Sequence, residues 1–168
     1  MGLFGFGKKK APELPPVDIA DDQICALADG EMIDLGTVPD PVFAQKMMGD
    51  GVAFKYAGNE VTICAPANGK LTALFPTGHA FGVTRSDGVE LLVHIGIDTV
   101  NAKGDGFKVL SHKQDDTVKA GEPIVTVDLK KLGAKYDMSV MLIVTNANGK
   151  EIKFAAPGKV TRGQVISL

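Results

Sequence analysis

The stretch that decides the fold spans residues 88–100 and reads GVELLVHIGIDTV. Residues 89–95 are apolar on both faces of an extended strand, apart from Glu90 and His94. A short run that is apolar on both faces is typical of a strand in the middle of a sandwich or barrel. The stretch therefore predicts a central β-strand that carries one histidine.

The rest of the chain also consists of short apolar runs separated by turn residues. Gly and Pro account for 20 and 9 of the 168 residues, and both types weaken the interiors of helices and strands. Further strands are expected at residues 52–55, 61–64, 70–75, 124–127, 140–144 and 160–168. The predicted fold is all-β, a barrel-sandwich or β-sandwich of short, mostly antiparallel strands.

One or two short helical turns are also expected. Residues 41–48 read PVFAQKMM, with Asp40 as a cap and Pro41 at the first helical position. Residues 128–135 read DLKKLGAK and are interrupted by Gly133. Neither segment is long enough to dominate the fold.

The chain divides into a tail and one domain. Residues 1–18 read MGLFGFGKKKAPELPPVD, which predicts a flexible tail with at most weak membrane contact through its apolar and basic residues. Residues 19–168 have a length that suits a single domain. No apolar stretch approaches the ~18 residues that a membrane-spanning helix needs.

Composition excludes several function classes. The net charge of −2 argues against a nucleic-acid partner. Cys25 and Cys64 form neither a C-x-x-C pair nor a disulfide framework. The sequence also lacks the G-x-S-x-G, P-loop and H-E-x-x-H motifs. Any phosphoryl group should therefore come from another protein.

His94 is the first candidate for chemistry. Its position in an apolar strand also fits a core histidine bonded to a backbone carbonyl. If the strand continues, Gly96 and Asp98 lie on the same face. Gly96 would then let a partner or a phosphoryl group approach the ring, and Asp98 could orient the imidazole or balance its charge.

His79 is the second candidate. It lies in PTGHAFG (residues 76–82), where Pro76 and Gly78 predict a bend outside regular, buried structure. Thr77 could hydrogen-bond an imidazole or a phosphate. A β-hairpin would place His79 across from His94. His112, in SHKQDD, is expected on the surface without a functional role.

Two imidazoles in one shallow site have three physical uses. One ring could accept a phosphoryl group while the other hydrogen-bonds the phosphate. The two could share a metal ion with a carboxylate. They could also act as a general acid and base.

Four segments of the sequence resemble a known family. GVELLVHIGIDTV resembles the active-site signature of the glucose-type enzyme IIA proteins of the bacterial phosphoenolpyruvate-dependent sugar phosphotransferase system. PTGHAFGVT resembles the segment that carries the second histidine of this family. PDPVFAQKMMGDGVAFK and KGDGFK resemble two further blocks in the same order. The resemblance extends over roughly residues 24–168.

The resemblance implies a phosphohistidine relay on a β-sandwich. His94 would accept the phosphoryl group from the histidine-containing phosphocarrier protein and pass it to a cysteine on the IIB domain of a sugar permease. His79 would support the phosphoryl group, Thr77 would bond His79, and Asp98 would lie at the edge of the site. The partner-docking residues would be Val42, Phe43, Met48, Phe75, Leu92, Gly96 and Val100.

The resemblance also implies a cellular location, an oligomeric state, a cofactor requirement and the partner that selects the sugar. The protein would be a cytoplasmic phosphotransferase component and a monomer that requires no cofactor. Zinc could bind His79 and His94 only with a ligand from a partner. The permease partner, rather than this chain, would choose the sugar among glucose, N-acetylglucosamine, maltose and β-glucosides.

The sequence also leaves two other classes of function open. A zinc hydrolase could use clustered histidines, although it needs a third protein ligand and the chain lacks an H-x-H pair. A carrier module of the biotinyl or lipoyl type would present a lysine at a hairpin tip. Residues 45–48, which read QKMM, faintly imitate such a tip.

Overall fold

The computed structural model describes residues 11–168. The predicted contact of Leu3, Phe4 and Phe6 with a membrane lies outside the described residues. Among the described residues, no helix is long and apolar enough to cross a membrane.

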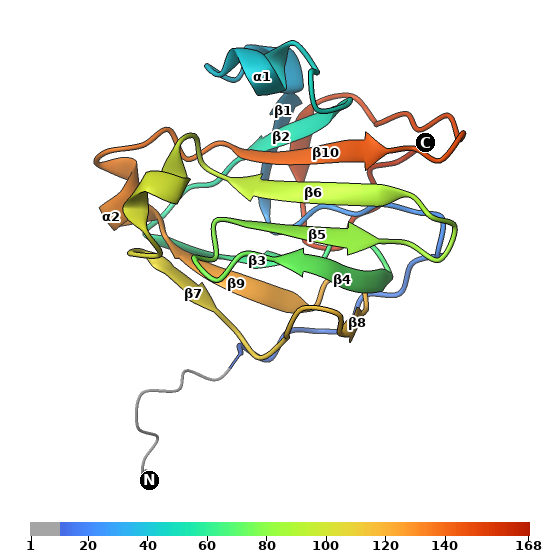
Figure 1. The fold of residues 1–168 in the computed structure, drawn as a ribbon, viewed down its shortest axis with the longest axis horizontal. Helices are drawn as coiled ribbons and strands as arrows, with labels where there is room; N and C mark the ends of the chain where they lie inside the picture. Colours follow the sequence, from blue (N-terminus) through green and yellow to red (C-terminus); the bar gives the residue numbers. More distant parts are fainter. Residues whose placement is uncertain (1–10) are drawn as a thin grey trace, which may run out of the picture.

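Two antiparallel sheets form the fold (Figure 1). The larger sheet has the strand order β11-β1-β2-β10-β6-β5-β4-β8, and the smaller has the order β3-β9-β7. The strands are β1 Gly30–Asp34, β2 Gly51–Lys55, β3 Glu60–Cys64, β4 Gly69–Leu74, β5 Ala80–Thr84, β6 Glu90–Ile95, β7 Phe107–Val109, β8 Thr117–Val118, β9 Pro123–Asp128, β10 Val140–Asn146 and β11 Gly158–Val160. The prediction of an all-β sandwich is confirmed.

Most of the predicted strands are present, with one clear error. Residues 160–168 do not form a long strand, because the chain after β11 makes only isolated bridges, Cys25 with Val165 and Phe154 with Ser167. The strands β1, β5, β7 and β8 were not predicted. They are short or contain glycine, so their apolar pattern is weak.

The two predicted helical turns are present and short. Helix α1 spans Pro41–Ala44, and the Asp40 carboxylate accepts a hydrogen bond from the Val42 amide at 2.9 Å. Helix α2 spans Leu129–Gly133 and is capped in the same way by Asp128. Two 3₁₀ turns, η1 Leu35–Thr37 and η2 Thr99–Ala102, complete the helical structure of the described residues.

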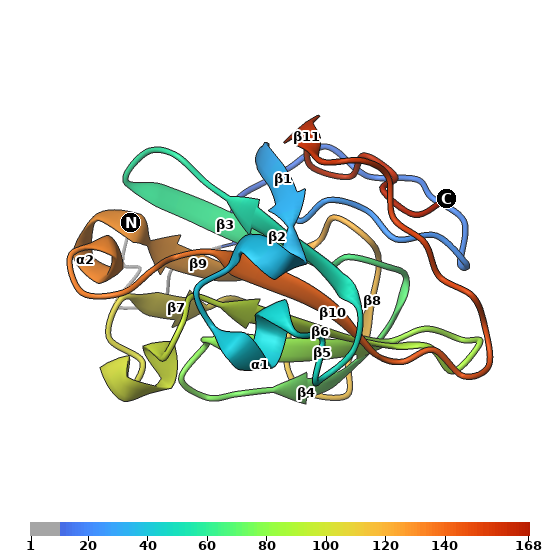
Figure 2. The same ribbon diagram turned by 90° about the horizontal axis from the view of Figure 1, so that it is seen from above.

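The central strand β6 has two different faces. Leu91, Val93 and Ile95 are buried in the main core between the sheets. Leu92 and His94 alternate with them and lie on the opposite face. Helix α1 lies on that outer face, away from β3 (Figure 2). A second apolar cluster there contains Leu35, Val38, Phe43, Ala53, Ile97, Met141 and Ile143.

Residues 15–17 already contact the body of the fold. A side-chain nitrogen of Arg162 donates to the Pro15 carbonyl, and another donates to the Gly121 carbonyl at 2.6 Å. Val17 packs against the turns that contain Gly121 and Gly163. The chain is therefore attached to the sandwich a few residues before Ile19.

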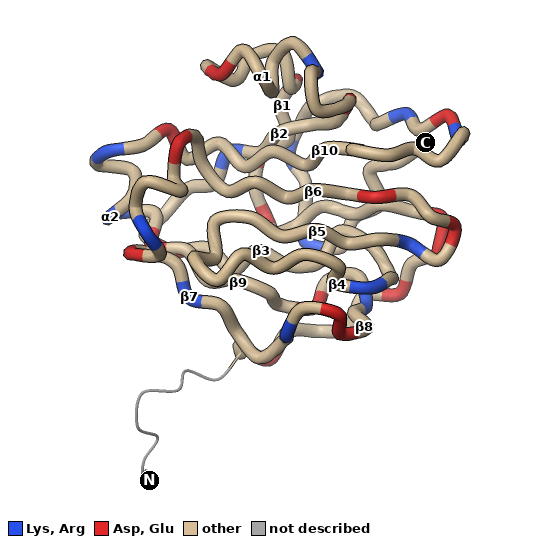
Figure 3. Tube along the Cα trace, in the orientation of Figure 1, with Lys and Arg blue, Asp and Glu red and all other residues tan. Residues whose placement is uncertain are grey.

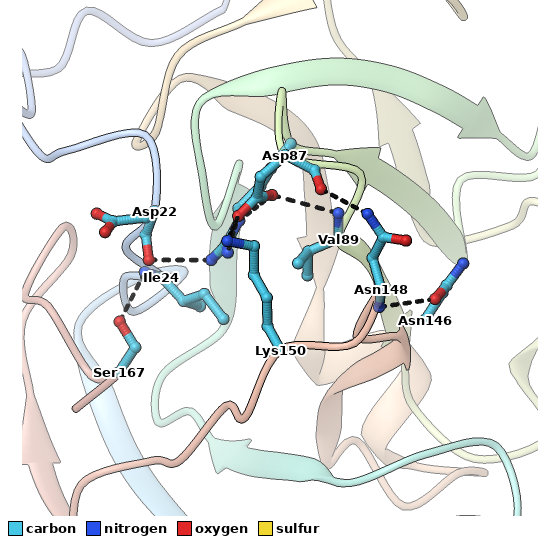
Figure 4. A network of polar contacts seen from close by, with 9 residues as sticks. Asp22, Ile24, Asp87, Val89, Asn146, Asn148, Lys150 and Ser167 are labelled. Carbon is cyan, nitrogen blue, oxygen red and sulfur yellow. Dashed lines mark hydrogen bonds and ion pairs between the residues drawn. The ribbon is translucent and has the colours of Figure 1, made fainter.

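A polar network ties the β5–β6 turn to two distant segments (Figure 4). The buried Arg85 donates to both carboxylate oxygens of Asp87, at 3.1 and 2.6 Å, and to the Asp22 carbonyl. Asn148 donates to the Asp87 carbonyl, and Lys150 lies 3.6 Å from its carboxylate. The hydrogen bond from Arg85 is the main cause that lowers the pKa of Asp87 to about 2.

The Asp87→Asn variant should unfold more easily, because it leaves the buried Arg85 guanidinium without its counter-ion. We expect a loss of roughly 3 kcal/mol in urea unfolding at pH 7. Because the folded-state pKa of Asp87 is depressed, its stabilisation of roughly 2 kcal/mol is complete above about pH 4. The wild type should lose it as the pH falls from about 4 towards 2, whereas the variant should lack this component.

Asp105→Asn is the matched control. Asp105 pairs with Lys131 at 2.7 Å, but both side chains are more than half exposed. Removing such a surface pair should cost less than about 1 kcal/mol. Equal losses from the two variants would contradict the role given to Asp87.

Candidate functional site

The β5–β6 hairpin brings His79 and His94 together. His94 is the last residue but one of β6, and it is paired with Ala80, the first residue of β5. The His79 carbonyl accepts from the Ile95 amide at 2.7 Å. The two imidazole centroids lie 5.4 Å apart, with the rings nearly perpendicular. Residues 15 positions apart in sequence therefore form one site.

Each imidazole uses its Nδ1 atom in a short local hydrogen bond. The Nδ1 atom of His79 lies 2.6 Å from the Thr77 hydroxyl, and that of His94 lies 2.8 Å from the Gly96 carbonyl. Because a carbonyl only accepts, neutral His94 carries its proton on Nδ1. Its Nε2 atom then holds a lone pair.

Burial sets the charge state of His94. Loss of solvent lowers the pKa of its imidazole. The bond to Gly96 and the negative charges of Asp40 and Asp98 oppose this effect without cancelling it. A neutral ring with a lone pair on Nε2 is the form that can act as a nucleophile.

His79 is more buried than the sequence indicated. The bend at residues 76–78 is present, but only 4% of His79 is exposed, so the expectation of a histidine outside buried structure is wrong. The Phe75 ring covers it edge-on, at a centroid distance of 5.1 Å. Burial, followed by the nearby charge of His94, lowers the pKa of His79. Both imidazoles are therefore neutral at pH 7.

The expected role of Gly96 as an opening beside the ring is wrong. Strand β6 ends at Ile95, and Gly96 has a φ of +80° rather than an extended backbone. A Cβ atom there would lie 2.4 Å from the Thr99 side chain and 2.9 Å from the Met138 sulfur. The missing side chain makes room for these neighbours. The contribution of Gly96 to the site is its carbonyl oxygen.

Asp98 acts on His94 through charge. The strand does not continue to it, since Asp98 has a left-handed backbone with a φ of 61° and begins η2 without a side-chain cap bond. Its exposed carboxylate still raises the pKa of His94. Asp40 acts in the same direction. The sequence predicted Asp40 only as a helix cap, and no short motif links it to residues 88–100.

The seven predicted docking residues fall into two groups. Val42, Met48, Phe75 and Val100 have exposed fractions of 40–53%. Phe43 is only 6% exposed, and its ring centroid lies 5.1 Å from that of His94. Leu92 is half-buried against the second apolar cluster, and Gly96 is buried. Val42, Met48, Phe75 and Val100, together with the partly exposed Leu92, are therefore accessible to a partner. Figure 3 shows that the middle of β5, β6 and β10 carries no charged residue.

The site offers a metal only two nitrogen ligands. Among residues 11–168, no group of three or more His, Cys, Asp or Glu side chains is arranged to hold a metal ion. A catalytic zinc site needs three protein ligands. The zinc-hydrolase alternative therefore lacks its metal centre in the part of the chain that the structure describes.

The carrier-module alternative also lacks its geometry. Lys46 follows α1, in a turn with a φ of 59°, and pairs with Asp50 at 3.1 Å. It does not lie at the tip of a β-hairpin.

The remaining reactive side chains lie apart from the site. Cys25 and Cys64 are buried, and burial raises the pKa of each thiol to about 12. His112 is held between Asp116 and Glu122, at 3.4 Å from each.

The comparisons agree with the sequence resemblance. The family model for the phosphoenolpyruvate-dependent sugar phosphotransferase system, EIIA 1, matches residues 22–150. The glucose-specific EIIA component of Mycoplasma capricolum is 42% identical over 87% of this chain and 94% of its own. The solved structure of glucose permease IIA from Mycoplasma capricolum has a TM-score of 0.80 and 42% identity, covering 86% of this chain and 93% of the other.

Some relatives are much longer. The glucoside-specific EIICBA component of Staphylococcus carnosus is 42% identical over 86% of this chain but only 21% of its own length. The chain thus spans about a fifth of such relatives. The match covers both histidine segments and most of the sandwich. The chain therefore belongs to the EIIA 1 family of the phosphoenolpyruvate-dependent sugar phosphotransferase system.

Proposed function

We propose that this chain is a phosphohistidine relay of the sugar phosphotransferase system. It accepts a phosphoryl group on His94 from the histidine-containing phosphocarrier protein and passes it to the IIB domain of a sugar permease. One observation carries this proposal. Two neutral imidazoles face each other, and each has its Nδ1 atom engaged and its Nε2 atom without a hydrogen-bond partner in the described residues.

The transfer depends mainly on how the protein positions the reacting nitrogen atoms and the phosphoryl group. The Nε2 lone pair of His94 attacks phosphorus in line, and a P–N bond forms as the bond to the donor imidazole breaks. The electron pair of the broken bond returns to the donor nitrogen. Phosphorylated His94 then carries positive charge, which the Gly96 carbonyl, Asp40 and Asp98 stabilise.

His79 acts as a hydrogen-bond donor to the phosphoryl group. If the Thr77 hydroxyl donates to Nδ1 of His79, the proton of that ring lies on Nε2. The two rings then hold opposite tautomers, one with a lone pair for phosphorus and one with a proton for a phosphoryl oxygen. The low exposure of His79 limits the access of water to this oxygen.

The exposed apolar residues around this polar centre suit transient docking. Val42, Met48, Phe75 and Val100 would contact the phosphocarrier protein and the IIB domain in turn. A sugar permease partner is supported by relatives named EIICBA, in which the matched segment is part of a longer chain. The permease would determine the sugar.

The remaining expectations belong to this proposal. The protein would work in the cytoplasm, as a monomer without a required cofactor and without nucleic-acid partners. Zinc would bind the Nε2 atoms of His79 and His94 only when a partner adds a ligand. The N-terminal tail would contribute at most weak membrane contact.

The direct test is incubation with phosphoenolpyruvate, enzyme I and the phosphocarrier protein. Acid-labile phosphate should appear on the chain, and mass spectrometric mapping should place it on His94. Phosphate on another residue, or none at all, would overturn the proposed function.

The rate of acceptance should depend on pH through His94. Its lowered pKa keeps the nucleophile neutral, so the rate should stay constant from pH 8 to about the ordinary histidine pKa of 6.5. It should fall only at lower pH, as the ring takes up a proton. Rapid-quench measurements with phosphorylated donor would check this, and NMR titration of the free protein would give the His94 pKa separately. A midpoint above 6.5 would contradict the burial effect.

A further inference from the structure

The peptide group between Gly96 and Ile97 connects the site to a second loop. Its carbonyl accepts from His94 Nδ1 at 2.8 Å, and its N–H donates to the Asp137 carbonyl at 2.9 Å. The carbonyl and N–H of a planar trans peptide point in opposite directions. Anchoring the N–H on Asp137 therefore directs the carbonyl at His94.

The loop that provides this anchor is a side-chain-stabilised turn. The Asp137 carboxylate accepts from the Ser139 amide at 2.8 Å and from the Ser139 hydroxyl at 2.6 Å. The Ser139 carbonyl in turn accepts from the Gly96 amide at 2.9 Å. The backbone carbonyls of residues 137 and 139 thus hold the amides on both sides of the Gly96 carbonyl. Figure 1 shows this segment, between α2 and β10, beside the loop after β6.

The loop after β6 is also fixed from its other side. The fully buried Thr99 donates from its hydroxyl to the Ile95 carbonyl at 2.5 Å. The Met138 sulfur fills the space where a side chain at Gly96 would lie. With Ile95 and Gly96 held in this way, the direction of the Gly96 carbonyl depends on the turn at residues 137–139.

We propose that Asp137 is a positioning residue for the relay. Its carboxylate holds the turn that aims the Gly96 carbonyl at His94 Nδ1, and it thereby keeps the lone pair of His94 on Nε2. A neutral imidazole without this bond has a second tautomer, in which Nε2 carries the proton and cannot attack phosphorus. The kinetic consequence rests on the proposed function, whereas the tautomer of His94 does not.

The test is the Asp137→Ala variant, read first by ¹⁵N NMR of the His94 imidazole. The wild type should show the Nδ1–H tautomer, and the variant should show a mixture of both tautomers. Phosphoryl acceptance should slow in proportion to the Nδ1–H fraction that remains, about tenfold where a tenth of the molecules keep that tautomer, with the KM for the phosphorylated donor unchanged. Asp137→Asn keeps an acceptor oxygen and should restore both readouts.

Asn146→Ala is the matched control at the other end of β10. The Asn146 side chain accepts from the Asn148 amide at 2.9 Å, in the same kind of turn, but Asn146 is paired with Glu90 at the far end of β6. This variant should leave the His94 tautomer and the acceptance rate unchanged. Ser139→Ala, which removes only the hydroxyl bond, should give a smaller shift of both readouts if Asp137→Ala does not fold.

Two outcomes overturn the positioning role. One is a folded Asp137→Ala protein in which His94 keeps a single Nδ1–H tautomer. The other is a tautomer change in Asn146→Ala as large as that in Asp137→Ala. Absence of phosphate on His94 in the wild type is a different result, because it would overturn the proposed function and leave the tautomer measurement intact.

Discussion

The His94→Gln variant is expected to accept no phosphoryl group from the phosphorylated carrier protein. Glutamine approximates the size of histidine but has no lone-pair nitrogen that can form a P–N bond. Removing the nucleophile from an enzyme that works by covalent catalysis costs on the order of 10⁶-fold in rate. Acid-labile label on the variant should therefore fall to background in assays that saturate the wild type.

The fold should survive this substitution. His94 lies on the outer face of β6, and its side chain is only partly buried, so the main core between the sheets is unchanged. His112→Gln is the matched control, since that histidine is held by Asp116 and Glu122. It should label like the wild type. Labelled His94→Gln protein would show that another residue accepts the phosphoryl group.

The His79→Gln variant should behave differently, accepting a phosphoryl group but passing it on slowly. Its amide can still donate a hydrogen bond, so phosphate can be held on His94. Glutamine lacks the rigid ring that Thr77 and Phe75 fix in place. Loss of one oriented donor to a transition-state oxygen costs on the order of 10²–10³-fold. We expect onward transfer to a purified IIB domain to slow by that factor.

Two-step kinetics separate this role from a general loss of structure. Acceptance from the carrier protein and discharge to IIB can be timed in single-turnover experiments. Thr77→Val, which removes the hydroxyl bonded to His79 Nδ1, should slow discharge in the same direction by a smaller factor. A His79→Gln protein that discharges at the wild-type rate would remove the role assigned to His79.

The sequence predicted the architecture well where the pattern is local. The apolar run at residues 89–95 indicated a central strand, and β6 lies between β10 and β5. Asp40 was recognisable as a cap, because capping depends on neighbouring residues. The segment 160–168 was predicted wrongly. Its apolar residues resemble a strand, but after Val160 it forms only isolated bridges to distant residues.

The site was predictable in its residue types but not in its geometry. Two histidines and a threonine could be chosen from motifs, and the hairpin does bring them together. The burial of His79 could not, because it depends on the Phe75 ring folding over it. Nor could the turn at Gly96, since its amide and that of Ile97 are held by the Ser139 and Asp137 carbonyls, which are distant in sequence. Asp137 is connected to the site through its backbone carbonyl, which accepts from the Ile97 amide. A pattern of side chains in the sequence does not reveal such a contact.

The position of His94 on a central strand has a consequence for the encounter with partners. Reactive groups often lie on loops, which must be ordered when a partner binds. Strand β6 is paired on both sides, by β10 and β5, so opening it requires breaking two ladders of hydrogen bonds. The proposed acceptor, His94, thus lies on a backbone that is already ordered before any collision. Little conformational entropy is lost at the nucleophile on association, and a brief, weak complex can still hold the reacting atoms in line.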